Sequence, residues 1–291
     1  MDRLDSLRIL VAEAASGELA FPTSAAAARR VRDALDDPDC EVAEAARLIQ
    51  TEPLLSARVV AVANSAAYNR SRRVVTDVRG AVTLLGFRTV RSLATALMVR
   101  QMAGTPKAPA HRELALQLWE HSAAVAAMAQ VVARMITHQD PETALFAGVV
   151  HEIGGFYLIS RAEDFPGLLD GDPGEWLGED QEEGGPADRR RTPESDIGRA
   201  VLKALAVPEP VAAAVEVLWK GYLAFPPASL GDTLLLADQL ATVKSPMLRA
   251  HGTQSRAPAG AIDMVLQEET LGGTLEDAAE EVESLAKALR F

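Results

Sequence analysis

The residues of this chain best suited to chemistry are histidines and carboxylates placed on apolar segments. His121 and His151 lie on two stretches with helical apolar spacing, Glu152 directly follows the second histidine, and Asp238 lies on a later stretch. Imidazole nitrogens and carboxylate oxygens bind divalent cations, and a bound cation can polarise a phosphate and activate water. The chemistry to weigh against the rest of the sequence is therefore metal-dependent phosphate hydrolysis.

The set of possible ligands is small for that chemistry. No histidine and no cysteine occurs between His151 and His251, whereas a divalent cation needs three or four protein ligands from neighbouring helices. We therefore predict no catalytic residue, no bound metal and no cofactor.

Composition favours a helical protein of the cytoplasm. Hydrophobic residues make up 48% of the 291 positions, much of this alanine and leucine, which are strong helix formers. The single cysteine, Cys40, excludes an intrachain disulfide framework and suits a reducing compartment. No apolar run approaches the ~20 residues that span a bilayer, and two early acids argue against a secretory signal. We expect no membrane association.

Charge is unevenly distributed along the chain. The net charge is −12, which opposes binding to nucleic acid because phosphates repel an acidic surface. Residues 1–104 nevertheless hold 14 basic against 12 acidic residues, and residues 105–291 hold 15 against 29. One interpretation is a solvated helix face with salt bridges to the acidic half. The other is a docking patch for an acidic partner or an anionic ligand, for which the candidates are Arg70, Arg72, Arg73, Arg88 and Arg91.

Apolar spacing predicts an all-α protein, since strand-like alternation persists nowhere for more than a few residues. Gly86 separates two short helices, and Asn64 at the end of another suits the left-handed conformation. With Ser65 and Tyr68, Asn64 could equally hold the loop to Arg88 by hydrogen bonds. A helix-turn-helix interpretation of residues 76–100 is disfavoured by the overall acidity. Helices are expected around residues 4–11, from 23, and at 42–49, 53–64, 78–86, 90–98, 114–135, 145–154, 197–205, 211–218, 230–240 and 274–289.

Breaker residues divide the chain into two parts. The cluster at 104–109 predicts an N-terminal helical subdomain, residues 1–104, packed on a helical bundle, residues 105–291. Residues 166–193 interleave glycine and proline with acids and predict an exposed, mobile loop. The amphipathic C-terminal helix, with Thr274 as a candidate N-cap, would seal the core or bind a partner, which leaves a homodimer possible.

Two blocks of sequence point to a family. The first comprises IQTEPLLSARVV at 49–60, ANSAAY at 63–68 and GAVTLLG at 80–86; the second comprises LWEHSAAVA at 118–126 and AGVVHEIG at 147–154. In this order they resemble the HDOD family, the HD-related output domain of bacterial signalling proteins, over residues 20–243. The resemblance implies an N-terminal helical bundle packed on an HD-like bundle, a role in signal transduction and no established enzymatic activity.

The resemblance also gives a meaning to the histidines and carboxylates. In catalytic relatives, paired His-Asp residues and further histidines bind one or two metals. His121 and His151 match two of those histidines, Asp238 matches the last carboxylate, and Glu152 replaces the aspartate of the pair. Ser195 stands at a position often held by histidine. These residues are therefore expected to be vestiges of an HD site, either a buried hydrogen-bond cluster or a remodelled pocket for a small ligand.

The residues and the resemblance together are compatible with three functions. The leading hypothesis is a non-catalytic regulatory module that acts through contact with a regulatory protein. The first alternative is a sensor that holds a nucleotide or cyclic dinucleotide in the degenerate pocket. The second alternative is a residual metal-dependent phosphohydrolase.

Overall fold

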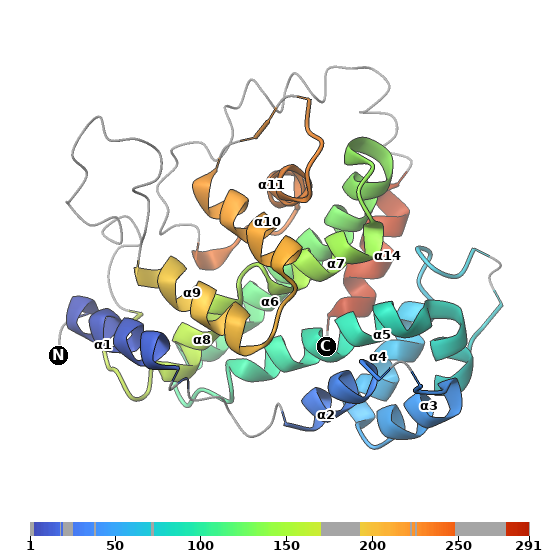
Figure 1. Cartoon of the computed structure of the whole chain (residues 1–291), viewed down its shortest axis with the longest axis horizontal. Coiled ribbons are helices and arrows are strands. Elements are labelled where there is room, and N and C mark those ends of the chain that lie inside the picture. Colours follow the sequence, from blue (N-terminus) through green and yellow to red (C-terminus); the bar gives the residue numbers. More distant parts are fainter. Residues whose placement is uncertain are drawn as a thin grey trace.

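The computed structural model describes residues 3–17, 19, 26–37, 39–70, 73–169, 193–221, 223–224, 226–247 and 278–290. Within these ranges every regular element is helical and none is a strand, which confirms the all-α class (Figure 1). The elements are α1 (Arg3–Ser16), α2 (Ala26–Ala34), α3 (Val42–Gln50), α4 (Pro53–Ala63), α5 (Val78–Met102), α6 (Pro109–Val132), the π-helical turn η2 (Ala133–Thr137), α7 (Pro141–Val150), α8 (Ile153–Arg161), α9 (Pro193–Ala204), α10 (Glu209–Lys220), α11 (Leu230–Leu240) and α14 (Ala279–Leu289).

Helix α5 is the central element of the molecule. It packs against α2, α3 and α4 on one side and against α7 and α8 on the other (Figure 1). Gly86 interrupts it with φ 74° and ψ 164°, a backbone conformation that is essentially restricted to glycine. The two short helices predicted on either side of Gly86 are therefore the two segments of α5.

Helix α1 lies with the second half of the chain. It packs against α9, and Glu13 accepts a hydrogen bond of 2.6 Å from Arg161 Nη1. Arg3 Nε donates to the carbonyl of Leu168 at 3.0 Å, and Leu168 is buried. The division of the chain at residue 104 stays a prediction, and a boundary there would separate α1 from the helix it contacts.

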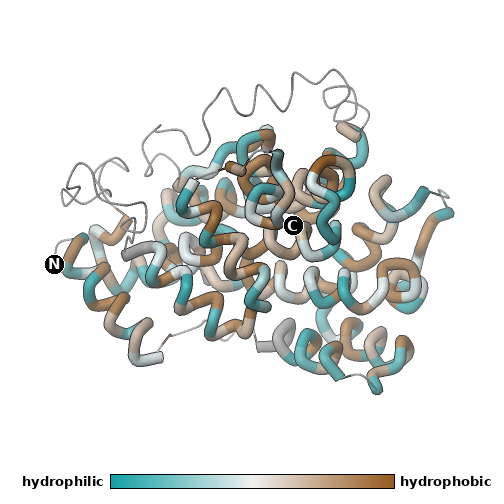
Figure 2. Tube along the Cα trace, turned by 45° about the horizontal axis from the view of Figure 1, so that its top comes forward, coloured by the Kyte–Doolittle hydropathy of each residue, from teal (hydrophilic) through white to brown (hydrophobic). Residues whose placement is uncertain are grey.

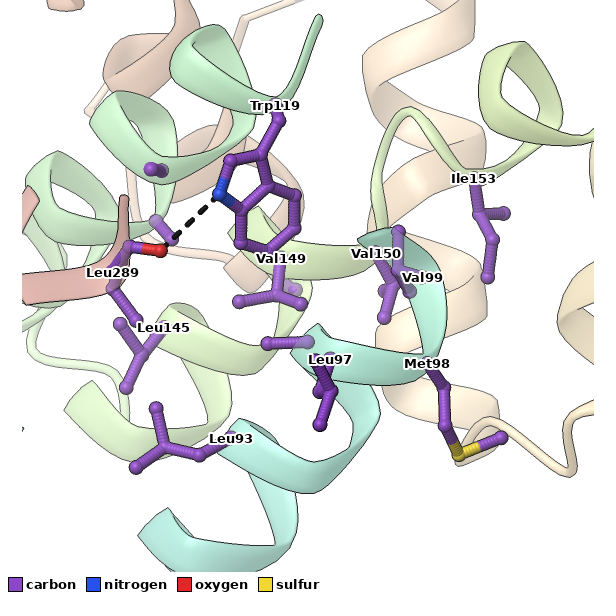
Figure 3. Close-up of a cluster of buried hydrophobic side chains, with 14 of the residues drawn as sticks. Leu93, Leu97, Met98, Val99, Trp119, Leu145, Val149, Val150, Ile153 and Leu289 are labelled. Carbon is purple, nitrogen blue, oxygen red and sulfur yellow. Dashed lines mark hydrogen bonds between the residues drawn. The ribbon is translucent and has the colours of Figure 1, made fainter. Parts of the chain in front are cut away.

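One continuous hydrophobic core runs through both halves. Its largest buried side chains include Trp119, Tyr157 and Phe156. Trp119 lies among leucines and valines of α5 and α7, and its indole Nε1 donates to the carbonyl of Leu289 at 3.2 Å (Figure 3). Helix α1, on the outside of the molecule, carries both hydrophobic and hydrophilic residues (Figure 2) and buries Leu7 and Leu10.

The C-terminal helix α14 covers α4 and α6. Arg134 of η2 holds it through a bidentate pair with Glu281, with N–O distances of 2.6 and 2.8 Å. Arg58 Nη1 donates to the carbonyl of Ala288 at 2.8 Å, a cation at a helix C-terminus. The sealing role expected for this helix fits these contacts. The candidate N-cap Thr274 lies outside the described residues.

Two apolar segments and the predicted mobile loop complete the description of the bundle. Residues 78–102 and 141–161 are long and apolar enough to cross a membrane by length and composition, but 67% of each window is buried inside the bundle.

The structure describes only the two ends of the predicted loop. Residues 166–169 lie against the bundle through Leu168, Pro193 begins α9, and residues 170–192 lie outside the described part.

Candidate functional site: a buried histidine cluster

Two histidines meet where α6 crosses the end of α7. His121 Nε2 and His151 Nε2 lie 3.1 Å apart, and the side chains are 0% and 2% exposed. Gly148 makes this approach possible, because a Cβ at that position would lie 2.4 Å from the Cα of Ala126. The close packing of the two helices therefore positions the histidine pair.

In each histidine ring a backbone carbonyl fixes the protonation of Nδ1. His121 Nδ1 lies 2.9 Å from the carbonyl of Val243, and His151 Nδ1 lies 2.7 Å from that of Gly148. A carbonyl oxygen only accepts hydrogen bonds, so both Nδ1 atoms must carry hydrogen. In two neutral rings the Nε2 lone pairs would then face each other. The pair is stable only with a proton or a cation at Nε2.

Two carboxylates complete the cluster. Asp238 Oδ1, on the buried face of α11, lies 3.3 Å from His121 Nε2. Glu152 Oε1 lies 3.9 Å from the same nitrogen and accepts a hydrogen bond of 2.8 Å from Ser245 Oγ. All four residues that the sequence singled out therefore converge, and we call His121, His151, Glu152 and Asp238 the histidine cluster.

The electrostatics of the cluster place a proton on one ring. Burial alone would lower the pKa of His121, but the carboxylate of Asp238, 3.3 Å from Nε2, and the charge of Glu152 outweigh burial and raise it. Burial and the charge on His121 together lower the pKa of His151. Without a metal, the proton that the facing Nε2 atoms require is therefore favoured on His121, beside Asp238, and His151 Nε2 accepts the hydrogen bond.

The same geometry also fits one divalent cation. His121, His151 and Asp238 each offer one ligand atom, and these atoms lie within 4.8 Å of one another. Two nitrogens at ~2.0–2.1 Å from zinc lie about 3.3 Å apart at a tetrahedral angle, close to the observed spacing. The Nδ1 bonds to carbonyls are the outer-shell contacts that orient metal-bound histidines. A cation held there would act as a Lewis acid; the absence of a metal stays a prediction.

Other sequence candidates lie elsewhere. Arg88 pairs with Asp140 at 2.9 Å and Arg91 with Asp36 at 2.9 Å. Arg88 therefore forms a salt bridge to the acidic half, as the alternative interpretation expects, whereas the partner of Arg91 lies within residues 1–104. Arg70 and Arg73 are exposed, and Arg72 lies outside the described residues. Ser195, on α9, accepts a hydrogen bond from Arg199.

Sequence reasoning missed a second polar cluster, centred on Glu142 of α7. Its carboxylate accepts hydrogen bonds from Tyr68 Oη at 2.9 Å, Thr89 Oγ1 at 2.6 Å and Gln130 Nε2 at 3.1 Å. Burial and the charge of Glu142 raise the pKa of Tyr68 far above its usual range. The four residues come from separate elements and carry no shared spacing, so only the fold brings them together.

Asn64 differs from its prediction. Its backbone is right-handed, with φ −92° and ψ −1°, so the left-handed cap expected here is wrong. The side chain instead bridges to Val75, with Nδ2 donating to the carbonyl at 2.7 Å and Oδ1 accepting from the N–H at 2.8 Å. These bonds fix the connection between α4 and α5.

Comparison with known proteins gives one family and one fold. The sequence matches the family model described as HDOD domain over residues 21–171. A Shewanella amazonensis protein, provisionally described as a metal-dependent phosphohydrolase, is 21% identical over 99% of both chains, with a TM-score of 0.71. An HDOD domain protein of unknown function from Geobacter sulfurreducens is 21% identical over 98% of both chains, with a TM-score of 0.59.

A third structure, from Marinobacter aquaeolei and provisionally described as a signal transduction protein, is 18% identical with a TM-score of 0.57. The match covers 93% of this chain and 60% of that one. No curated protein matches at a significant level. At these identities the likeness to solved structures establishes a shared helical fold.

Proposed function

This chain belongs to the HDOD family, and from that membership we propose that it is a non-catalytic signal-transduction module of the cytoplasm that acts by contacting a regulatory protein. The observation that carries the proposal is the burial of three of the four residues of the histidine cluster, since the Glu152 side chain keeps 16% of its surface exposed. His121, His151 and Asp238 are 0%, 2% and 2% exposed, and their polar atoms face one another and backbone carbonyls. A phosphoester would have to displace packed helices to reach them.

The surface supports the same view. A hollow of about 420 Å³ lies near the start of α6 and the end of α8, where Lys107, Glu163 and Leu168 are among its lining residues. None of the residues of the histidine cluster lines it. A nucleotide sensor built on the degenerate pocket meets the same obstacle as a hydrolase, because the ligand would need the buried donors.

The experiment is a hydrolysis assay on protein loaded separately with zinc, manganese and ferrous iron. Substrates are p-nitrophenyl phosphate, bis-p-nitrophenyl phosphate, nucleoside triphosphates and cyclic dinucleotides, and the control is the His151→Ala variant. We expect the native chain to hydrolyse each substrate no faster than the variant does with any metal, read as inorganic phosphate from the triphosphates, p-nitrophenol from the two nitrophenyl esters and linear dinucleotide from the cyclic dinucleotides. Turnover that depends on His151 would contradict the proposal and favour the phosphohydrolase.

The sensor alternative has a separate readout. A ligand that binds only the native state raises the unfolding temperature, and above Kd the rise grows with the logarithm of the ligand concentration. We expect no concentration-dependent rise with cyclic dinucleotides or common nucleotides. A rise in unfolding temperature that grows with ligand concentration and is lost on Asp238→Asn would favour the sensor instead.

A further inference from the structure

The connection between α4 and α5 contains a short backbone edge that is bonded on one side. Val75 offers both its N–H and its carbonyl to Asn64, at 2.8 and 2.7 Å, and the carbonyl of Arg73 accepts from Asn69 Nδ2 at 2.6 Å. In an extended chain the N–H and carbonyl of one residue point to the same side, and those of its neighbours point to the other. Residues 73 and 75 therefore face the protein through two asparagines.

The opposite side of this edge carries no protein partner in the described part of the chain. Val74 and Thr76 are exposed, and no hydrogen bond from either is present there. Val74 is 79% exposed, the highest value among the exposed large hydrophobic residues of the described ranges. A strand edge with open N–H and carbonyl groups pairs readily with another extended chain.

Basic residues predominate in the sequence on both sides of this edge. Residues 53–108 hold nine arginine and lysine residues and one acid, Asp77, and that acid accepts from Gly80 N as a helix N-cap. Arg70, Arg73 and Arg79 are exposed. Unlike Arg88 and Arg91, they form no ion pair with any residue that the structure describes.

We propose that the segment Arg73–Thr76 is a docking edge for an extended, acidic segment of a partner protein. The partner's backbone pairs with Val74 and Thr76, one of its apolar side chains covers Val74, and its carboxylates face Arg70, Arg73 and Arg79. This inference rests on the proposed function and names the chemistry of the partner.

A peptide fits this edge better than a nucleic acid does. Phosphates would use the arginines, but they would leave Val74 and the open backbone groups without partners. The net charge of −12 also opposes the binding of a long polyanion.

The test uses a labelled, capped heptapeptide that alternates glutamate with valine and the full chain enriched in ¹⁵N. Alternation puts the carboxylates on one face and the valines on the other. We expect saturable binding with shifts of the Val74 and Thr76 amide signals. The double variant Arg73→Glu, Arg79→Glu should weaken binding about tenfold or more, because each reversal removes an attraction and adds a repulsion.

Two controls isolate the edge. Arg47 and Arg290 are also exposed and unpaired in the described residues, so the double variant Arg47→Glu, Arg290→Glu changes net charge equally and should bind as the native chain does. The same peptide with alternate backbone nitrogens methylated keeps its charge and loses its donors. It should bind much more weakly, and this control needs no change in the protein.

The proposal fails if the peptide does not bind, if both double variants weaken binding equally, or if the methylated peptide binds as well as the parent. It also fails if oligothymidylate binds more tightly and competes for the same amide signals. If any of these outcomes is found and the chain shows no phosphohydrolase activity, the docking-edge proposal is wrong and the proposed function is unaffected. Metal-dependent turnover would instead remove the proposed function.

Discussion

At the scale of single residues, the pH dependence of stability depends on the positive charge between His121 and His151. The two Nδ1–H bonds to the carbonyls of Val243 and Gly148 fix both Nε2 atoms as the facing pair. Because the rings are buried, whatever binds between them is held away from solvent. The pair therefore behaves as a structural element that contains a proton or a cation.

The pH dependence of stability follows from the pKa shifts of the two rings. The raised pKa of His121 contributes stability that is complete below 6.5 and is lost as pH rises through the folded-state pKa. The lowered pKa of His151 costs stability as pH falls below 6.5, because only the unfolded ring then takes a proton. For chelator-treated protein we predict that the pair's contribution to the unfolding free energy is greatest near pH 6.5.

Urea titrations between about pH 5 and 8 measure that contribution as the difference between the native chain and the His121→Asn, His151→Asn variant. If the difference changes in one direction only across this range, the assignment of one raised and one lowered pKa is wrong.

Tyr68 offers a second prediction for a single residue. Tyr68→Phe removes the bond to Glu142 and an acceptor for Gln130 Nε2, which should cost about 1–3 kcal/mol at neutral pH. Because the folded-state pKa of Tyr68 is raised, its contribution is complete below 10.0 and is lost as pH rises above that value. The stability difference between the native chain and the variant, from urea unfolding, should narrow above pH 10.0. A difference independent of pH would show that Glu142 does not control this phenol.

Individual site residues could be named from the sequence because apolar helices flank them. His121, His151, Glu152 and Asp238 each lie within a recognisable helical stretch, and the structure brings them together. The protons and partners could not be predicted, because the carbonyls of Val243 and Gly148 have no sequence signature. The Glu142 cluster has four members from distant positions in the chain, so no local sequence pattern predicts it.

Among the elements, the packing of α6 on α7 sets the geometry of the histidine pair. Gly148→Ala would put a methyl group 2.4 Å from the Cα of Ala126, where backbone atoms cannot move aside. We predict a loss of about 3 kcal/mol or more in unfolding free energy. Gly155→Ala is the matched control, because its Cβ would meet side-chain atoms and no backbone, Leu118 Cδ2 at 3.0 Å and Met247 Cγ at 3.4 Å. Equal losses in the two variants would contradict this view of the helix crossing.

The attachment of α14 gives a prediction that depends on salt. Glu281→Gln breaks the bidentate pair with Arg134, whose side chains are 19% and 31% exposed. Solvent screening limits the expected loss to about 1 kcal/mol, and the loss should shrink as salt is added. Glu280→Gln, on the exposed face of the same helix, should be neutral. A loss that salt does not change would mean that packing, and not charge, holds α14 through this residue.

Helix boundaries show what propensity alone can and cannot predict. Gly86 is recognisable as a break because few other residues adopt φ 74° with ψ 164°. The long helix expected through residue 135 ends at Val132 and continues as the π-helical turn η2, with His138 at φ 52°. Tertiary contacts select that turn, including a hydrogen bond of 2.6 Å between Thr137 and Thr233, and these contacts leave no mark in the apolar spacing.

At the scale of the whole molecule, a single hydrophobic core connects the helices beside the docking edge, Arg73–Thr76, to the bundle that contains the histidine cluster. Helix α5 contacts both groups of helices, and the Glu142 cluster joins Tyr68 to α7. The helical class and the family could be predicted from the sequence, since both follow from local patterns. The position of α1 against α9 could not, because it depends on surfaces that form only in the folded chain.

The most direct test of a closed, non-catalytic cluster is the accessibility of the histidines to diethyl pyrocarbonate in the native protein, read by peptide mass spectrometry. His138 is exposed and should react at once, whereas His121 and His151 should react only when urea unfolds the chain. Reaction of His151 in the native state at the rate of His138, especially if a phosphate ester slows it, would mean that the cluster is open to ligands and would contradict the proposed function.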